Sequence, residues 1–294
     1  MSVRTLLPFL LLSFLLGCKS EPAVEDRFDN LTESERDSLS THYHEISMAL
    51  YQPSEMHRRF KDTALIVKPD HVEYRQRLSY SYKKRGEHIE AMRILNEAVE
   101  RDIEKNKTFA LQYRAWSLLF FYRDYEGTIK DVDLINEMEP RNDYTVCHGE
   151  PCNVLKGQAL YKLGRYREAI EVLENVMKVE KEKGWDPNDN WHANFYSARA
   201  YSELGEYKKA EEIYLSQIAA NPLFTEAYFQ LGKNYSETGE FEKASKYLNQ
   251  ASELLVKGNK MGEPYYEAFD EVFAYQIEEE LQKIRAVSSK EFLD

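Results

Sequence analysis

The sequence predicts an all-α solenoid in which pairs of helices stack side by side along one axis. The prediction rests on an internal repeat, because residues 201–207 fall on residues 235–241 when the chain is shifted by 34 residues. Tyr201 then meets Tyr235, and the turn at 204–207 meets the turn at 238–241. A fixed period of this size is typical of repeats that bury a core only by stacking on their neighbours. Such arrays usually bind partners, so the period also favours binding over catalysis.

The 34-residue period divides residues 71–258 into five units, each expected to form two antiparallel helices. The units cover residues 72–105, 109–142, 150–183, 191–224 and 225–258. Seven extra residues separate the unit that ends at 183 from the unit that begins at 191, and another insertion, residues 143–149, lies before the unit at 150–183. The repeat pattern is therefore interrupted twice.

Small residues recur in the units for a physical reason. Gly232, Ala244 and Ala198 occupy positions where two helices are expected to cross closely, so a larger side chain would push the helices apart. A glycine also follows the first helix of four units and supplies the left-handed backbone that the turn needs. These turn residues are Gly86, Gly164, Gly205 and Gly239. The second helix is then expected to open with an aromatic residue, at Tyr166, Tyr207 and Phe241.

These positions resemble the tetratricopeptide repeat (TPR) family, whose unit has an aromatic before Leu-Gly, then a Tyr, a Gly turn and later Ala residues. The unit at 225–258 carries the pattern most fully, in Tyr228, Leu231, Gly232, Tyr235, Gly239, Phe241, Ala244, Leu248 and Ala251. The unit at 109–142 departs from it, with Trp116 where the family prefers Gly and Thr128 where it prefers Ala. The resemblance implies a right-handed superhelix whose concave groove is lined by the first helix of each unit.

Further helices are expected to close both ends of the array. Residues 32–70 should form a helical pair, which is interpreted as a decayed sixth repeat, and Thr32 with Glu35 fits a capping box at its start. In the C-terminal part, residues 259–294, apolar side chains recur with a period near 3.6 after Pro264. This stripe predicts a capping helix over residues 264–286, with the proline in its first turn.

The first 18 residues have the features of a secretion signal. Arg4 precedes an apolar run of eleven residues at 6–16, which is shorter than the roughly 20 residues that a membrane-spanning helix needs. The ending Leu15-Leu16-Gly17-Cys18 resembles the bacterial lipoprotein box. That resemblance implies a signal peptide over residues 1–17, cleavage before Cys18 and acylation of this cysteine. An ordinary secretory signal with a chance cysteine is the alternative.

The lipoprotein resemblance implies a place at the bacterial cell envelope. Two or three acyl chains suffice for stable anchoring. Residues 18–31 would form a flexible tether, because they hold too few apolar side chains to fold. Lys19 stands where enterobacterial lipoproteins retained at the inner membrane carry Asp, so the outer membrane is the favoured location.

The other two cysteines, Cys147 and Cys152, lie where the insertion at 143–149 meets the unit at 150–183. A pair so close in sequence favours a disulfide in an oxidising compartment, with Gly149 and Pro151 shaping the turn. Two free thiols and a redox-active pair are the alternatives. Together with His148, the two cysteines supply too few ligands for a metal site. We therefore predict neither a metal nor a cofactor.

Charge and motifs narrow the class of function. The chain has 39 Lys and Arg against 51 Asp and Glu, a formal net charge of −12. The sequence has no basic stripe with interleaved aromatics, which argues against a nucleic-acid partner. An acidic body also avoids anionic lipid, so the acyl chains are the expected membrane contact. Motifs for a zinc protease, a phosphate-binding loop or a serine nucleophile are missing from the sequence, and we predict that the protein is not an enzyme.

In the family that the units resemble, unit positions 2, 5, 9 and 12 line the concave groove. Transferred to this sequence, these positions nominate aromatic, basic and amide side chains for partner binding: Tyr80, Lys83, Tyr113, Phe120, Gln158, Tyr161, Phe195, Arg199, Phe229 and Lys233. This mixture suits a peptide or an extended segment. Arg199 and Lys233 hold equivalent positions and are expected to project into the groove beside Phe195 and Phe229. Packing between neighbouring helices is the alternative role for the aromatic residues.

The sequence thus predicts a lipid-anchored, non-catalytic scaffold or adaptor that binds a protein or peptide at the bacterial envelope, without predicting the partner's identity or the oligomeric state. The alternative is a lipoprotein that captures glycan or peptide ligands for an outer-membrane transporter. An envelope hydrolase is disfavoured, because no catalytic constellation is evident.

Overall fold

The computed structural model describes residues 28–263 and 266–291, and apart from one short hairpin its regular elements are helices. The first helices of successive pairs are α1 (Glu33–Met48), α3 (Val72–Lys84), α5 (Phe109–Ser117), α7 (Cys152–Lys162), α9 (Trp191–Glu203) and α11 (Thr225–Glu237). The second helices are α2 (Glu55–Val67), α4 (His88–Glu104), α6 (Tyr125–Met138), α8 (Tyr166–Glu182), α10 (Tyr207–Ala220) and α12 (Phe241–Val256), and the last element is α13 (Ala274–Glu291). The predicted signal peptide and Cys18 lie outside the described residues.

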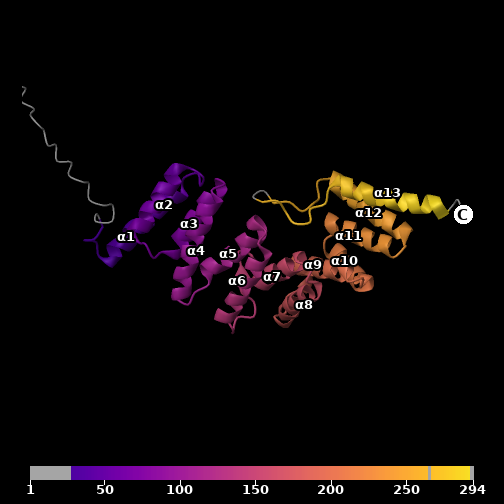
Figure 1. Cartoon of the computed structure of the whole chain (residues 1–294), viewed down its shortest axis with the longest axis horizontal. Helices are drawn as coiled ribbons and strands as arrows, with labels where there is room; N and C mark the ends of the chain where they lie inside the picture. The colour runs from indigo at the N-terminus through magenta and orange to yellow at the C-terminus, as the bar shows by residue number, and fades with distance from the viewer. Residues whose placement is uncertain (1–27, 264–265, 292–294) are drawn as a thin grey trace, which may run out of the picture.

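The helix pairs stack into an elongated, curved solenoid (Figure 1). Helices that are consecutive in the chain pack on one another, and from α3 onward the first helix of each pair also contacts the first helix of the next pair. All five predicted units form such pairs, with their helices inside the predicted boundaries. The pair α1–α2 continues the series and begins with the predicted capping box, in which Thr32 and Glu35 bond reciprocally. The predicted all-α solenoid is confirmed.

Close crossings within the pairs depend on the predicted small residues. A Cβ atom added at Gly232 would lie 2.7 Å from Leu248 Cγ, and one added at Gly157 would lie 2.4 Å from Leu173 Cδ2. The first helices can therefore approach their partners only without a side chain at these positions. The predicted turn glycines adopt left-handed conformations, at Gly86, Gly164, Gly205 and Gly239. Helices α8, α10 and α12 begin at the predicted aromatic residues.

The divergent unit at 109–142 departs from regular α-helix geometry. Helix α5 runs on as a π-helical turn, Leu118–Tyr122, which Arg123 ends with a φ of 55°. Trp116 lies just before this turn, and its ring contacts Phe120 and Phe121 at centroid distances of 5.8 and 5.3 Å. The other four units have Gly, Ala or Ser at the position of Trp116. The bulky residue thus coincides with a π-turn, a local insertion that helices often carry at special sites.

Both insertions form defined structures. The first is a two-stranded antiparallel hairpin of β1 (Val146–Cys147) and β2 (Glu150–Pro151). Its turn residues, His148 and Gly149, have φ values of 55° and 102°, and two left-handed residues in succession suit a two-residue hairpin turn. Cys147 and Cys152 form a disulfide in the structure, with Cα atoms 4.8 Å apart. The second insertion, between α8 and α9, contains a 3-10 turn at Pro187–Asp189.

The C-terminal region differs from the prediction. The predicted helix over residues 264–286 is wrong at its start, since the helix begins at Ala274 and residues 266–273 are not helical. Between α12 and α13 the chain returns toward the middle of the solenoid (Figure 1). We call residues 259–263 and 266–273 the C-terminal strap; Pro264 lies outside the described residues. Helix α13 then packs on α11 and α12, where a cap was expected.

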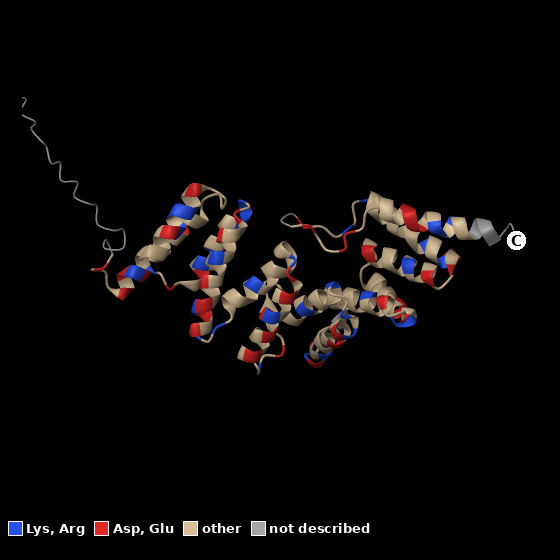
Figure 2. Cartoon of the chain, viewed as in Figure 1, with Lys and Arg blue, Asp and Glu red and all other residues tan. Residues whose placement is uncertain are grey.

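Charged residues of both signs are interspersed along the helices (Figure 2). Several pair with a neighbour one turn away, as Arg165 does with Glu168 at 2.6 Å and Lys243 with Glu240 at 2.6 Å. Exposed pairs of this kind contribute little to stability. None of the helices in the described part is both long enough and apolar enough to span a membrane.

Candidate partner-binding groove

The C-terminal strap lies against the first helices of the middle pairs, on the side where the groove was predicted (Figure 1). Its position is held by contacts with residues far away in sequence. Arg123 donates to the carbonyl oxygen of Glu267, 144 residues away. The backbone N–H of Met261 donates to Glu226 Oε1 at 2.8 Å. The predicted groove therefore has a part that the strap covers and a part, at α3 and α5, that it leaves open.

Asp270 anchors the strap through three polar contacts. Its carboxylate lies 2.7 Å from Lys162 Nζ and 2.6 Å from Arg199 Nη1, and it accepts a hydrogen bond from the Tyr196 hydroxyl at 3.0 Å. Burial alone would raise the pKa of Asp270, but the charges of Arg199 and Lys162 outweigh burial and hold the pKa below its usual range. Asp270 has a φ of 57°, a conformation that Asp tolerates better than most residues. The backbone thus presents a carboxylate directly to two groove cations.

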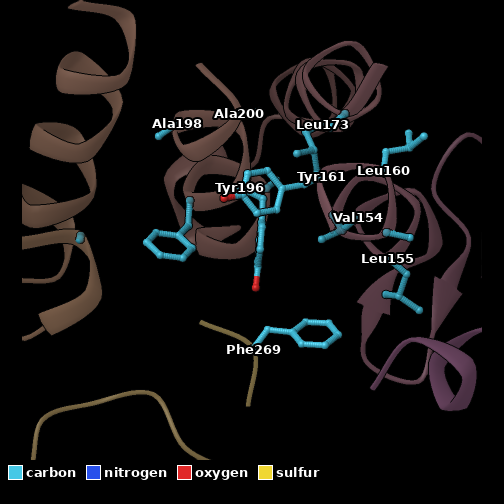
Figure 3. Close-up of a cluster of buried hydrophobic side chains, with 14 of the residues drawn as sticks. Val154, Leu155, Leu160, Tyr161, Leu173, Tyr196, Ala198, Ala200 and Phe269 are labelled. Atoms are coloured by element: carbon cyan, nitrogen blue, oxygen red, sulfur yellow. The ribbon is translucent and has the colours of Figure 1, made fainter. Parts of the chain in front are cut away.

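Two aromatic side chains of the strap dock beside Asp270. The ring of Phe269 stacks on Phe120 with a centroid distance of 5.3 Å, and the Arg123 guanidinium lies 3.9 Å from its centroid. Figure 3 shows Phe269 on the strap beneath Tyr196 of α9. The ring of Tyr266 lies 5.0 Å from that of Phe120. Aromatic pairs at these distances stabilise beyond the area that they bury.

Several predicted groove residues are not open to a partner in this structure. The expectation that Arg199 projects freely into the groove is wrong, because it is paired with Asp270 under the strap. Lys233 is half-buried, and its Nζ lies 5.8 Å from the ring of Phe229, so the expected strip of two open cations does not form. Four of the nominated aromatic residues are buried, which agrees with the alternative role of packing between neighbouring helices: Phe120, Tyr161, Phe195 and Phe229.

Gln158 lies beneath the strap with its whole side-chain amide unpaired. It is fully buried, and neither its Nε2 nor its Oε1 has a hydrogen-bond partner among the described residues. Gln158 lines a cavity of about 270 Å³ together with Phe120, Tyr196 and Tyr266. An amide side chain offers both a donor and an acceptor, which is what a peptide group needs. The covered part of the groove therefore retains a polar contact that the strap does not use.

Lys83, also nominated for the groove, is enclosed by aromatic rings. Its Nζ lies 3.6 Å from the ring centroid of Phe121 and 4.9 and 5.1 Å from those of Tyr113 and Trp116. It donates hydrogen bonds to the Tyr113 hydroxyl at 2.9 Å and to Ser117 Oγ at 3.3 Å. Burial lowers the pKa of Lys83 to about 7. Lys83 thus belongs to the groove wall and is not an exposed contact.

The open part of the groove is a cavity of about 320 Å³ between α3 and α5. Aromatic and polar side chains line it: Gln52, Gln76, Arg77, Tyr80, Phe109, Gln112, Tyr113 and His148. Two of these were predicted, Tyr80 and Tyr113, and their rings meet edge to face with centroids 6.4 Å apart. Phe109 is 48% exposed. The structure thus brings two of the ten nominated residues to an open cavity.

The described residues offer little for chemistry. No group of three or more His, Cys, Asp or Glu side chains among them could hold a metal ion. The carboxylate of Asp270 is engaged by its two cations and a tyrosine. The arrangement of aromatics, amides and cations suits the binding of a polypeptide segment.

Comparison with protein families identifies the repeats. One tetratricopeptide repeat model matches residues 154–223, and a second matches residues 225–254. Residues 154–223 and 225–254 of the chain are tetratricopeptide repeats. The matches span the repeats formed by α7–α12, while the helix pairs before them are recognised from their stacking in the structure. No curated protein sequence matches the chain.

Solved structures share the TPR fold at low sequence identity. PilF of Pseudomonas aeruginosa is 13% identical with a TM-score of 0.57, over 85% of this chain and 98% of that protein. MamA of Desulfovibrio magneticus RS-1 is 22% identical with a TM-score of 0.53, over 63% of this chain and 96% of that protein. YrrB, a TPR protein with an unusual peptide-binding site, is 15% identical with a TM-score of 0.50, over 66% and 91%. These similarities show the fold alone.

Arg199 and Phe120, which contact the strap, were nominated from the sequence, whereas Lys162, Phe269 and Asp270 were not. Lys162 follows the nominated position of Tyr161 by one residue, so the family positions pass over it. Phe269 and Asp270 lie outside the repeats, in a stretch whose apolar spacing imitates a helix. A usable signal is the cluster of Gly258, Gly262 and Pro264, because these residues break helices and precede the strap's anchors.

Proposed function

We propose that this TPR protein is a non-catalytic scaffold that binds an extended segment of a partner protein in the open part of its groove. One observation carries the proposal: the cavity between α3 and α5 joins the accessible rings of Tyr80 and Phe109 to amide side chains. Aromatic anchors supply most of the binding energy at such surfaces, and amides bond the backbone of an extended chain.

The strap supports an extended ligand for this groove. Its residues 266–270 bind through two rings and one carboxylate and contain no helix. In the open part, Tyr80 and Phe109 would hold an apolar side chain of the partner, Gln112 its backbone, and Arg77 an acidic group. YrrB, which shares the fold and has a peptide-binding site, supports the proposal by analogy.

Site-specific photo-crosslinking in native membranes tests the groove assignment. A photoreactive phenylalanine in place of Gln112 should form a discrete adduct with one protein, because Gln112 lines the open cavity. The matched control carries the same group in place of Tyr275, which is 62% exposed on α13. No comparable adduct is expected from the control position.

Substitutions then distinguish groove binding from nonspecific contact. Tyr80→Ala, combined with the crosslinker at position 112, should reduce the adduct several-fold while the helical circular dichroism is retained. Tyr275→Ala in the same background should leave the adduct unchanged. If Tyr80→Ala has no effect, or if position 275 forms the same adduct, another surface binds the partner.

We further propose that a lipid on Cys18 holds the scaffold at a bacterial envelope membrane, with the outer membrane favoured. The support is the segment Leu15–Cys18 together with the basic start and short apolar run before it. Mass spectrometry of the mature N-terminus should find a diacylglyceryl group on Cys18, and Cys18→Ala should give an unprocessed or released protein. A mature chain that begins without modification at a later residue would contradict the anchor.

A further inference from the structure

The two insertions that interrupt the repeats meet in space and line a third cavity, of about 350 Å³. The hairpin before α7 contributes Glu150, and the insertion between α8 and α9 contributes Asp186 and Asp189. Glu180, near the end of α8, completes the set of carboxylates. We call this space the acidic cavity, after these four residues. It is separate from the open part of the groove at α3 and α5.

Glu180 is the central group of the acidic cavity. Its side chain lines the cavity, yet the residue is only 3% exposed. Oε1 accepts hydrogen bonds from the Tyr144 hydroxyl at 2.5 Å and from Asn190 Nδ2 at 2.8 Å. Oε2 is buried and has no hydrogen-bond partner among the described residues. A buried carboxylate oxygen without a donor is costly, so this atom points to a ligand that brings one.

The cavity offers acceptors and negative charge but few free donors. The two donors nearest Glu180, on Tyr144 and Asn190, are already used by its Oε1. None of the described residues that line the cavity is Lys or Arg. The neighbouring Lys183 pairs instead with Asp143 at 2.9 Å. A ligand that complements this lining must therefore carry both N–H or O–H donors and positive charge.

Aromatic rings form the rest of the lining. Trp185 is 50% exposed and meets the ring of Tyr144 edge to face, with centroids 5.0 Å apart. Trp191 is 36% exposed and lies against His192, whose Nδ1 is 2.8 Å from Glu150 Oε1. Tryptophan is the best aromatic partner for a cation, and exposed tryptophans beside carboxylates are suited to an alkylated amine.

We propose that the acidic cavity binds an organic primary ammonium group, with its N–H donors on Glu180 Oε2 and its alkyl chain against Trp185 and Trp191. This chemistry occurs in a small diamine and in a lysine side chain. A quaternary ammonium would satisfy the rings but not Glu180, because it has no N–H. A neutral sugar would leave the carboxylates without a counter-charge. A metal ion is disfavoured, since no suitable ligand group exists among the described residues.

Titration of the full chain in a nonionic detergent tests the site. The probes are 1,4-diaminobutane, Nα-acetyl-lysine amide, choline and glucose. Binding of each probe is measured by calorimetry and by tryptophan fluorescence. Either primary amine should bind and change the fluorescence, while choline and glucose should bind at least about tenfold more weakly. Tighter binding of diaminobutane would indicate a small-molecule ligand, and tighter binding of the lysine derivative would indicate a protein side chain.

Two substitutions and a matched control locate the binding. Glu180→Gln keeps the size of the side chain and removes its charge, and should weaken amine binding at least about tenfold. Trp185→Ala changes an exposed ring, and should weaken binding about threefold or more without affecting the fold. Glu182→Gln, two residues away on the exposed side of α8, should have no effect.

The proposal is overturned if neither amine binds, if choline or glucose binds as well as the amines, or if Trp185→Ala leaves amine affinity unchanged. Should Glu180→Gln fail to fold, the Trp185→Ala result decides. Loss of amine binding would not affect the proposed groove function, whose crosslinking position lies at α5.

Discussion

Arg199 and Lys83, two cations of the groove, are accommodated in different ways at the scale of single residues. Arg199 has a full counter-charge in Asp270. Lys83 is held by aromatic rings and by the hydroxyls of Tyr113 and Ser117. The pKa of the Asp270 carboxyl and the pKa of the Lys83 amine are both lowered in the folded protein. The two groups therefore make the free energy of unfolding depend on pH in separate ranges, acidic for Asp270 and neutral to alkaline for Lys83.

Asp270→Asn should lower the free energy of unfolding by about 3–5 kcal/mol at neutral pH, because it leaves Arg199 buried without its counter-charge. The pKa of Asp270 is lower in the folded protein than in the unfolded chain. Wild type therefore has this stabilisation in full above the ordinary carboxyl range and loses it as the pH falls through the lowered pKa. Urea unfolding should show the gap between wild type and variant shrinking toward about pH 3. Asp143→Asn, at a side chain 61% exposed, is the control and should cost less than about 1 kcal/mol.

Lys83→Met should flatten the rise of stability between neutral and alkaline pH. The pKa of Lys83 is about 7 in the fold and about 10.4 in an unfolded chain. Between these values the unfolded chain binds the extra proton, so wild-type stability increases with pH. Met retains the apolar contacts and does not titrate. Burial also lowers the pKa of Lys61, to about 8, so a smaller rise of stability with pH remains in both wild type and Lys83→Met. Parallel pH profiles in urea unfolding would show that Lys83 keeps its ordinary pKa.

At the scale of elements, the helix pairs were predictable because their information is local. A turn glycine such as Gly239, followed by Phe241 and a small residue three positions later, specifies a turn and a second helix within a few residues. The strap was not predictable in this way. Tyr266, Phe269 and Val272 have helical spacing, yet their burial depends on partners up to about 150 residues away. A pattern read along one segment carries no information on such partners.

The groove residues were predictable in part, because a residue's position within its repeat is local information. Unit positions nominated Tyr80, Tyr113 and Gln158 for the groove; in the structure Tyr80 and Tyr113 line the open cavity and Gln158 lines the covered one. Whether a residue there is open depends on the strap, as Arg199 shows. The acidic cavity was not predicted either, because it forms between two insertions, and repeat positions describe only the repeats.

Gly232→Ala tests the close crossing of α11 and α12. The added methyl group would lie 2.7 Å from Leu248 Cγ, so the helices must separate, at a cost of roughly 1–3 kcal/mol. Gly262→Ala is the matched control, since a Cβ atom there meets nothing within 4 Å. Thermal unfolding should show a lower midpoint for the first variant and little change for the second. A midpoint equal to that of wild type for Gly232→Ala would mean that the crossing of α11 and α12 accommodates a methyl group.

At the scale of the whole molecule, the strap changes the connectivity of the solenoid. A repeat array normally has contacts only between neighbouring units. Here Lys162 and Asp270 pair across 108 residues, and Arg123 and Glu267 bond across 144. The end of the chain is thereby tied to its middle, and opening of the strap is coupled to the exposure of α7 and α9.

Phe269→Ala should release the strap and make this coupling visible by hydrogen exchange. Removal of a buried phenylalanine costs about 3–5 kcal/mol, so strap amides such as that of Met261 should exchange about a hundredfold faster or more. Amides of α7 and α9 should also exchange faster, whereas those of α1 and α2 should not change. Tyr275→Ala is the control. Acceleration confined to residues next to position 269 would show that the strap is not coupled to the middle helices.

The sequence position of the strap also sets an order in time. Tyr196 and Asp270, which bond in the finished fold, are 74 residues apart. A ribosome adds about 5–20 residues per second, so Asp270 is joined to the chain about 4–15 s after the groove residue that it contacts. During that interval Lys162 and Arg199 have been synthesised and their anchor has not. A partner present at this stage meets no competitor for the two cations, whereas a partner that arrives later must first displace the strap.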